Sequence, residues 1–240
     1  MRLPWKPIKG VFMERLNRFV GLVNISGSVS RVHIHDPGRL SELLIFGAEV
    51  LVREHAVAGR KTDYFLFAVK HGDMWILIDS SLHSKIVEEA VRENLIKELE
   101  GYSILKREFK FKSSRIDFLL KSPSGVKVLM EVKGCTLVKD GLALFPDAPT
   151  SRGRRHVLEL IDAVHQGFES IILFLILRED ANAFMPNWDV DPEFSKVLLN
   201  AHNHGVKVLA YTAPLNVSNL EIKVTRPVKV FFKSHHEPKN

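Results

Sequence analysis

Two carboxylates and one lysine are spaced so that a small β-hairpin would bring them together. Residues 121–125 have the composition of a turn and separate two apolar runs that contain β-branched and aromatic residues. Because side chains alternate along a strand, Glu131 and Lys133 point to one face, and antiparallel pairing can place Asp117 beside them. Neighbouring carboxylates raise each other's pKa unless a cation lies between them, and hard oxygen ligands suit Mg²⁺ or Mn²⁺. A lysine there could orient water and stabilise the charge of a phosphoryl transition state.

The Glu-x-Lys pattern is not specific by itself, because two further copies begin at Glu108 and Glu221. Only the copy at Glu131 has an aspartate, Asp117, on a preceding predicted strand and a predicted helix after it. This arrangement resembles the site of PD-(D/E)xK nucleases. The resemblance implies catalytic roles for Asp117, Glu131 and Lys133, and the alternative is a solvated sheet face.

Length and composition set the class of protein. The chain has 240 residues, 45% hydrophobic and 26% charged, which is ordinary for a soluble protein of one large or two modest domains. Its formal net charge of +6 fits a polyanionic partner such as DNA. A single cysteine, Cys135, excludes an internal disulfide, and no N-terminal run has the apolar length of a signal peptide or membrane span. We therefore expect a cytoplasmic protein that does not contact a membrane.

The first part of the chain, 1–80, is rich in short β-type runs separated by turn residues. Five such runs with one short helix near 38–44 predict a small OB-like β-barrel. Barrels of this kind bind nucleic acid through basic and aromatic side chains, although any one of the arginines in this stretch is more often an ordinary solvated residue, and Phe19 a core residue. His33 and His35 share a strand face but lack a third ligand, so we interpret them as a structural pair. The candidate DNA contacts are Arg15, Arg18 and Arg39, with Phe19 and Arg31 as further candidates.

A change from strand to helix periodicity near Ser80 predicts a boundary between domains 1–80 and 81–240. The second domain should begin with a helix that runs to Gly101 and carries Glu89, and should continue with three strands, then a helix, a fully buried strand, a helix and a strand. That order matches the α/β mixed sheet of restriction-endonuclease-like folds, in which the first helix can supply a metal-site glutamate. Glu89 would then complete a metal shell with Asp117 and Glu131. The polar C-terminal stretch with His235 and His236 should be frayed.

Basic side chains crowd the first turn of the helix predicted from Thr150 or Ser151 to about Gln166. Cations at a helix N-terminus oppose the macrodipole, which is easier to understand if a phosphate binds among them. The alternative is a solvated charge cluster. The phosphate-binding candidates are Arg152, Arg155 and His156.

Several separated stretches, in order, resemble the sugar fermentation stimulation protein A family over nearly the whole chain. They are RLNRFVGLV, HDPGRLSELLIFGAEVLV, RIDFLL, EVKGCTLV, FPDAPTSRGRRHVLEL and GVKVLAY. The resemblance implies an OB-like domain, a nuclease-like domain, DNA binding with little sequence preference and a role in regulating sugar metabolism. Two functions follow: a DNA-binding protein with a Mg-dependent deoxyribonuclease site, or a non-catalytic, sequence-nonspecific DNA-binding regulator of sugar (maltose) metabolism. The sequence does not decide between them, and it is compatible with a homodimer.

Overall fold

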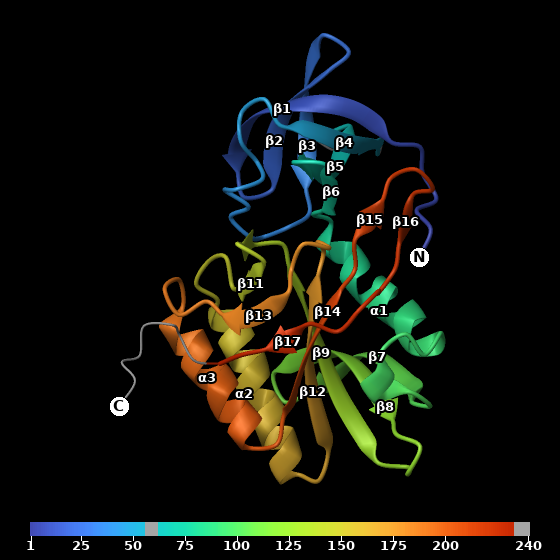
Figure 1. Cartoon of the computed structure of the whole chain (residues 1–240), viewed down its shortest axis with the longest axis vertical. Helices are drawn as coiled ribbons and strands as arrows, with labels where there is room; N and C mark the ends of the chain where they lie inside the picture. Colours follow the sequence, from blue (N-terminus) through green and yellow to red (C-terminus); the bar gives the residue numbers. More distant parts are fainter. Residues whose placement is uncertain (56–61, 233–240) are drawn as a thin grey trace.

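The computed structural model describes residues 1–55 and 62–232. It shows a β-barrel at one end of the long axis and a larger α/β part at the other, with the N-terminus lying near the junction (Figure 1). The expectation for the polar stretch with His235 and His236 lies outside the described residues. No helix within the described ranges is long and apolar enough to span a membrane.

The N-terminal part is a closed barrel, because the strands at the two ends of its sheet order pair with each other. β1 to β5 pair with antiparallel neighbours in the order β3-β2-β1-β4-β5, and a parallel pairing of β3 with β5 closes the ring. Phe12, Val23 and Val32 fill the interior and are almost fully buried. The predicted OB-like barrel is confirmed. Its strands are β1 (Ile8–Asn17), β2 (Val20–Ile25), β3 (Ser28–Ile34), β4 (Glu49–Glu54) and β5 (Tyr64–His71), with β6 (Met74–Leu77) added beside β5.

The short helix expected near 38–44 is wrong, because the structure has only turns there. Leu40 has a positive φ of 51°, a conformation that a right-handed helix does not contain. Its backbone N–H is bonded to the Asp147 carboxylate at 3.1 Å, and its side chain is buried. Contacts with the second part of the chain therefore override the local helical pattern.

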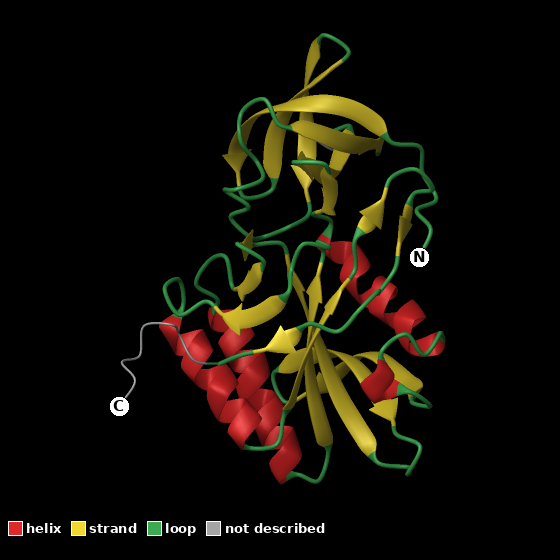
Figure 2. Ribbon diagram, viewed as in Figure 1, coloured by secondary structure: helices red, strands yellow, loops and turns green. Residues whose placement is uncertain are grey.

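The C-terminal part is built on a five-stranded mixed sheet in the order β14-β12-β9-β8-β7. The three strands β9, β12 and β14 are parallel, whereas β7, β8 and β9 pair antiparallel. Helix α1 covers one face and helices α2 and α3 cover the other (Figure 2). The predicted α/β mixed sheet is confirmed. The elements are α1 (His83–Arg92), β7 (Ser103–Phe111), β8 (Ser114–Lys121), β9 (Lys127–Cys135), α2 (Ser151–His165), β12 (Glu169–Ile176), α3 (Pro192–Asn203) and β14 (Lys207–Thr212).

Alternation along β9 decides which face carries the chemistry. Val128 and Met130 pack in the core beneath α1, whereas Leu129 and Cys135 pack in the core beneath α2. Glu131 follows the second set, so its side chain belongs to the α2 face. β12 is buried along both faces, as its unbroken apolar run predicts.

Helix α1 is shorter than predicted. It ends at Arg92, and Asn94 then adopts a positive φ of 54°. The Asn94 side chain accepts a hydrogen bond from Gly101 N at 3.1 Å, which stabilises the turn that replaces the expected last helical turns. The helical spacing of apolar residues in the sequence extends beyond Arg92 because Leu99 is also buried, although it lies in a separate 3₁₀ turn, Lys97–Leu99.

Small strands and the chain start connect the two parts. Leu3 N donates to Leu220 O at 2.8 Å, so the first residues pair with the far end of the chain. One hydrophobic cluster runs from Phe12 in the barrel to Tyr211 in the mixed sheet. The remaining strands are β10 (Val138–Lys139), β11 (Leu142–Phe145), β13 (Ala183–Pro186), β15 (Leu215–Asn216), β16 (Glu221–Ile222) and β17 (Lys229–Val230).

Candidate active site

The hairpin of β8 and β9 places Asp117 where the two strands separate. Their pairing runs from Lys121↔Lys127 to Phe118↔Met130 and stops there. Beyond it, the Asp117 Oδ2 atom accepts a hydrogen bond from Val132 N at 2.8 Å. A side chain thus replaces the next ladder bond, which holds the carboxylate at the edge of the strand that carries Glu131.

Glu131 is the centre of the site. Its side chain is 4% exposed, and Oε1 accepts hydrogen bonds from Lys133 Nζ at 2.6 Å and from His156 Nδ1 at 2.5 Å. Its other oxygen, Oε2, is buried without a hydrogen-bond partner among the described residues. The structure therefore brings Asp117, Glu131 and Lys133 together and leaves one carboxylate oxygen unused.

A serine from α1 also contacts this group. Ser84 Oγ donates to Asp117 Oδ1 at 2.9 Å, so both Asp117 oxygens have protein donors. No local pattern indicates this role, because it depends on how α1 lies across the sheet.

The two carboxylates have opposite pKa shifts. Burial, and then the charge of Glu131, raises the pKa of Asp117 to about 6, against the opposing effects of its hydrogen bonds and Lys133. Burial also raises the pKa of Glu131, but Lys133 and His156 outweigh it and hold that pKa below its usual value. One carboxyl is thus kept ionised while its neighbour lacks full charge compensation.

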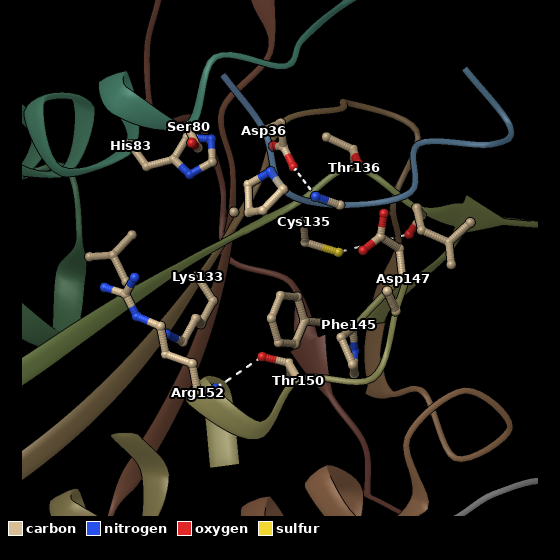
Figure 3. A pocket seen from close by; sticks show the side chains of 18 of the residues that line it. Asp36, Ser80, His83, Lys133, Cys135, Thr136, Phe145, Asp147, Thr150 and Arg152 are labelled. Atoms are coloured by element: carbon tan, nitrogen blue, oxygen red, sulfur yellow. Dashed lines mark hydrogen bonds between the residues drawn. The ribbon is translucent and has the colours of Figure 1, made fainter. Parts of the chain in front are cut away.

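The site opens into a cavity between the barrel and the mixed sheet, with a volume of about 320 Å³. The barrel contributes Arg18 and the segment 36–38, and the α/β part contributes Lys133 and Arg152. Figure 3 shows Asp36 and His83 on one side of this cavity and Lys133 and Arg152 on another.

The predicted barrel arginines lie near this cavity but differ in availability. Arg15 donates to the backbone carbonyls of Arg18, Asp36, Gly38 and Arg39, so its guanidinium holds the chain in place and is not free for DNA. This corrects its predicted role, and the physical reason is the fold of the 36–39 segment around it. Arg18 is exposed and lines the cavity, with one bond from Nε to Pro37 O at 3.0 Å. Arg39 is exposed.

The basic residues in the first turn of α2 also differ in availability, since some are exposed and one is buried. Thr150 caps the helix by accepting from Gly153 N at 3.0 Å, and Arg152 and Arg155 are exposed. Of these two, Arg152 lines the cavity. His156 is 2% exposed and bonded to Glu131, so the prediction that it contacts phosphate is wrong. It lies four residues before buried Leu160, a helical spacing that indicates the buried face.

Glu89 does not join the two carboxylates. Its side chain forms an ion pair with the amino group of Met1 at 2.6 Å, and it does not line the cavity. Along a helix, Ser84 and Glu89 point in different directions, and the packing of α1 turns Ser84 toward Asp117. The structure therefore corrects the predicted shell of Glu89, Asp117 and Glu131.

A glycine makes room for a histidine beside Lys133. A Cβ atom on Gly134 would lie 2.0 Å from His83 Cε1, so only glycine fits beneath this imidazole. Burial lowers the pKa of His83 to about 4, so the ring is neutral at physiological pH. His83 was not among the predicted site residues, because nothing in the sequence places the start of α1 against β9.

Comparisons with known proteins agree with this architecture. Residues 13–78 match the family model "SfsA N-terminal OB domain", and residues 81–219 match "Sugar fermentation stimulation protein RE domain". The chain belongs to the sugar fermentation stimulation protein family.

Curated relatives and a solved structure match almost the whole chain. A sugar fermentation stimulation protein homolog of Methanothermobacter thermautotrophicus is 45% identical over 88% of this chain and 88% of its own. A homolog of Pyrobaculum arsenaticum is 48% identical over 84% of this chain and 85% of its own. The solved structure of Pyrococcus furiosus SfsA in complex with Ca²⁺ is 32% identical, with a TM-score of 0.89, and the match covers 96% of this chain and 98% of that one. The family resemblance inferred from the sequence is confirmed.

Proposed function

We propose that this chain is a DNA-binding protein with a metal-dependent phosphodiesterase site, a deoxyribonuclease that uses Mg²⁺ or Mn²⁺. The observation that carries the proposal is the buried Glu131, whose Oε1 is fixed by Lys133 and His156 while Oε2 has no partner among the described residues. Asp117 lies beside it on the neighbouring strand, with a pKa raised to about 6 by burial and by Glu131.

The residues present fit a divalent cation. A buried carboxylate oxygen without a donor is costly unless a cation or water satisfies it, and two adjacent carboxylates favour a hard cation. Within the described ranges no three His, Cys, Asp or Glu side chains converge as a metal shell. Asp117 and Glu131 would therefore supply two ligand groups, and water, backbone or phosphate oxygens the others. When bound, the cation supplies Lewis-acid stabilisation of a phosphoryl oxygen.

The solved structure of the relative from Pyrococcus furiosus is a complex with Ca²⁺, which supports divalent-cation binding within the family. Ca²⁺ and Mg²⁺ both prefer oxygen ligands and differ in size and coordination number. We propose that Asp117 and Glu131 bind Mg²⁺ or Mn²⁺ in this chain.

Other residues of the chain would orient water and bind the DNA backbone. Lys133 is largely buried beside Glu131 and still has N–H groups that can face the cavity, so it can orient water and stabilise charge that develops on phosphate. Arg152 and Arg18 line the same cavity from α2 and from the barrel, where they can bind the flanking backbone. Arg155 and Arg39 are exposed and available for further DNA contacts.

The test is cleavage of labelled DNA by the purified protein with Mg²⁺ or Mn²⁺. We expect cleavage that stops with a chelator and in Asp117→Asn, Glu131→Gln and Lys133→Ala. Lys127→Ala is the matched control, because Lys127 is an exposed lysine on the same strand, β9, and should keep full activity. No cleavage beyond that of Asp117→Asn would exclude the nuclease.

A second function is favoured by one feature of the site. Lys133 is already bonded to Glu131, and Glu89 does not complete a third carboxylate ligand. The chain would then be a non-catalytic, sequence-nonspecific DNA-binding regulator of sugar metabolism that keeps the site as an anchor. It predicts binding without cleavage under every metal, and an affinity that falls steeply with salt because phosphate contacts release counterions.

A further inference from the structure

Barrel residues 36–40 cover the cavity beside Lys133, and this segment is called the roof below. Leu40 N is bonded to Asp147 Oδ2 at 3.1 Å, and a Cβ atom on Gly38 would lie only 2.6 Å from the same oxygen. Arg15 holds this segment from the barrel side through the carbonyls of Gly38 at 2.8 Å and Asp36 at 3.1 Å. The roof is therefore tied to both parts of the molecule, and a substrate that reaches Lys133 must pass beside it.

The size of the cavity restricts what can enter. Its volume of about 320 Å³ lies at the lower end of the ~300–1,000 Å³ that small-ligand pockets span. A phosphate with its sugar fits such a volume, but volume alone does not select an unpaired strand, because the phosphates of a duplex also lie on the outside of the helix. The choice between a single strand and a duplex therefore depends on what the bases contact beside the cavity.

The barrel carries a row of ring side chains, in which Phe19 and His35 are exposed and His33 between them is half-buried. Phe19 is 45% exposed and stacks on His33 with 6.2 Å between ring centroids and an interplanar angle of 14°. His33 in turn contacts His35, with 5.5 Å between centroids. Rings of this kind bind nucleic-acid bases by stacking, which is tolerant of sequence because every base has a π-face.

Both ends of this row reach residues that line the cavity. At the Phe19 end, the Arg18 guanidinium lies over the ring, 5.8 Å from its centroid, and Arg18 lines the cavity. At the other end, the carbonyl of His35 accepts a hydrogen bond from Ser80 N at 3.2 Å, and Ser80 also lines the cavity. The row itself is not part of the cavity wall, but both of its ends adjoin the cavity through Arg18 and Ser80.

The charges along this path suit a phosphate backbone that crosses a metal site. Arg18, Lys133 and Arg152 provide positive charge from three different elements. The carboxylates Asp36 and Asp147 accept backbone N–H groups of the roof. Asp117 and Glu131 are the ligand pair of the proposed function, so the cation they bind offsets their charge.

We propose that the substrate is single-stranded DNA, bound with its bases on Phe19, His33 and His35 and with one phosphate in the cavity beside Lys133. The inference rests on the proposed function for the chemistry at that phosphate. It adds the strandedness of the substrate and the barrel surface that selects it.

The test measures binding without metal, in a chelator, by fluorescence anisotropy of one labelled oligonucleotide alone or annealed to its complement. We expect the single strand to bind more than about fivefold tighter than the duplex, and Phe19→Ala to weaken its binding about 5- to 150-fold, the range that one base stack contributes. Phe19→Trp should restore binding. Phe46→Ala is the matched control, because Phe46 is a barrel phenylalanine that is 80% exposed and lies outside the row. Its affinity should equal that of the parent protein.

Equal or tighter binding of the duplex would overturn the inference, as would a Phe19→Ala variant that binds the single strand like the parent. These outcomes are separate from those of the proposed function, since they are measured without metal. Metal-dependent cleavage of duplex DNA that requires Asp117 would leave the nuclease standing and remove only the single-strand proposal. Strand-selective, Phe19-dependent binding without cleavage would do the reverse.

Discussion

The contact between His156 and Glu131 predicts that a residue outside the ligand pair controls metal affinity. His156 Nδ1 lies 2.5 Å from Glu131 Oε1, and the two side chains are 3% and 4% exposed. The change His156→Ala removes this partner and one of the groups that lower the pKa of Glu131. Glu131 then loses a restraint on its orientation and part of the stabilisation of its charged form.

The magnitude follows from the kind of bond that is lost. A hydrogen bond to a charged group contributes about 1.5–3 kcal/mol, and removing an outer partner of a metal ligand typically lowers metal affinity by about 10–100-fold. Lys133 still bonds Glu131, so we expect weakening within this range and not complete loss. The assay is calorimetric titration with Mn²⁺, and with Ca²⁺ as a second cation.

Two variants make the result interpretable. His156→Asn keeps a donor near the position of Nδ1 and should recover part of the affinity. His165→Ala changes an exposed histidine in the last turn of the same helix and should bind metal like the parent. Unchanged affinity in a folded His156→Ala protein, with thermal unfolding as the check, would refute the reasoning.

Three further predictions concern single positions. Gly134→Ala should lower the free energy of unfolding by about 1–3 kcal/mol in urea titrations, because its Cβ would lie 2.0 Å from His83 Cε1; a parent-like value would contradict that packing. Burial raises the pKa of Asp36 to about 7, above its unfolded value, so the folded state binds the Asp36 proton more tightly than the unfolded state does. The stability that this proton contributes is lost as pH rises toward 7. Asp36→Asn should therefore flatten the dependence of the urea midpoint on pH between about pH 4 and 7, and an unchanged slope would exclude the effect. Burial raises the pKa of the Cys135 thiol to about 12, so a thiol reagent should label it slowly in the native protein and rapidly in urea, and rapid native labelling would contradict its burial.

The sequence was informative where structure is local. The turn at 121–125 fixes the β8–β9 hairpin, and strand alternation then puts Glu131 and Lys133 on one face with Asp117 beside them. The unbroken apolar run of β12 identifies a strand buried on both sides for a similar reason, since neighbouring residues in the chain carry the pattern. Element order and fold class follow from such patterns.

The contacts that complete the site depend on how helices pack. Whether Ser84 or Glu89 of α1 faces Asp117 is decided by the rotation of that helix on the sheet, which Ile86 and Val87 set by packing into the core. Helical spacing marked the buried face of α2, but only the packing of that face on β9 shows that His156 meets Glu131.

The cavity itself was outside the reach of sequence patterns, because its walls come from segments far apart in the chain. Leu40 meets Asp147 only when the barrel lies against the mixed sheet, and Arg15 binds the loop around Gly38, 23 residues away in the chain, only when the barrel has folded. These contacts override the local helical pattern near Leu40 and turn a basic side chain that resembled a DNA contact into a structural one. Residue types and spacing therefore determined the chemistry available to this protein, while long-range packing decided which side chains surround it and how much of a substrate can reach them.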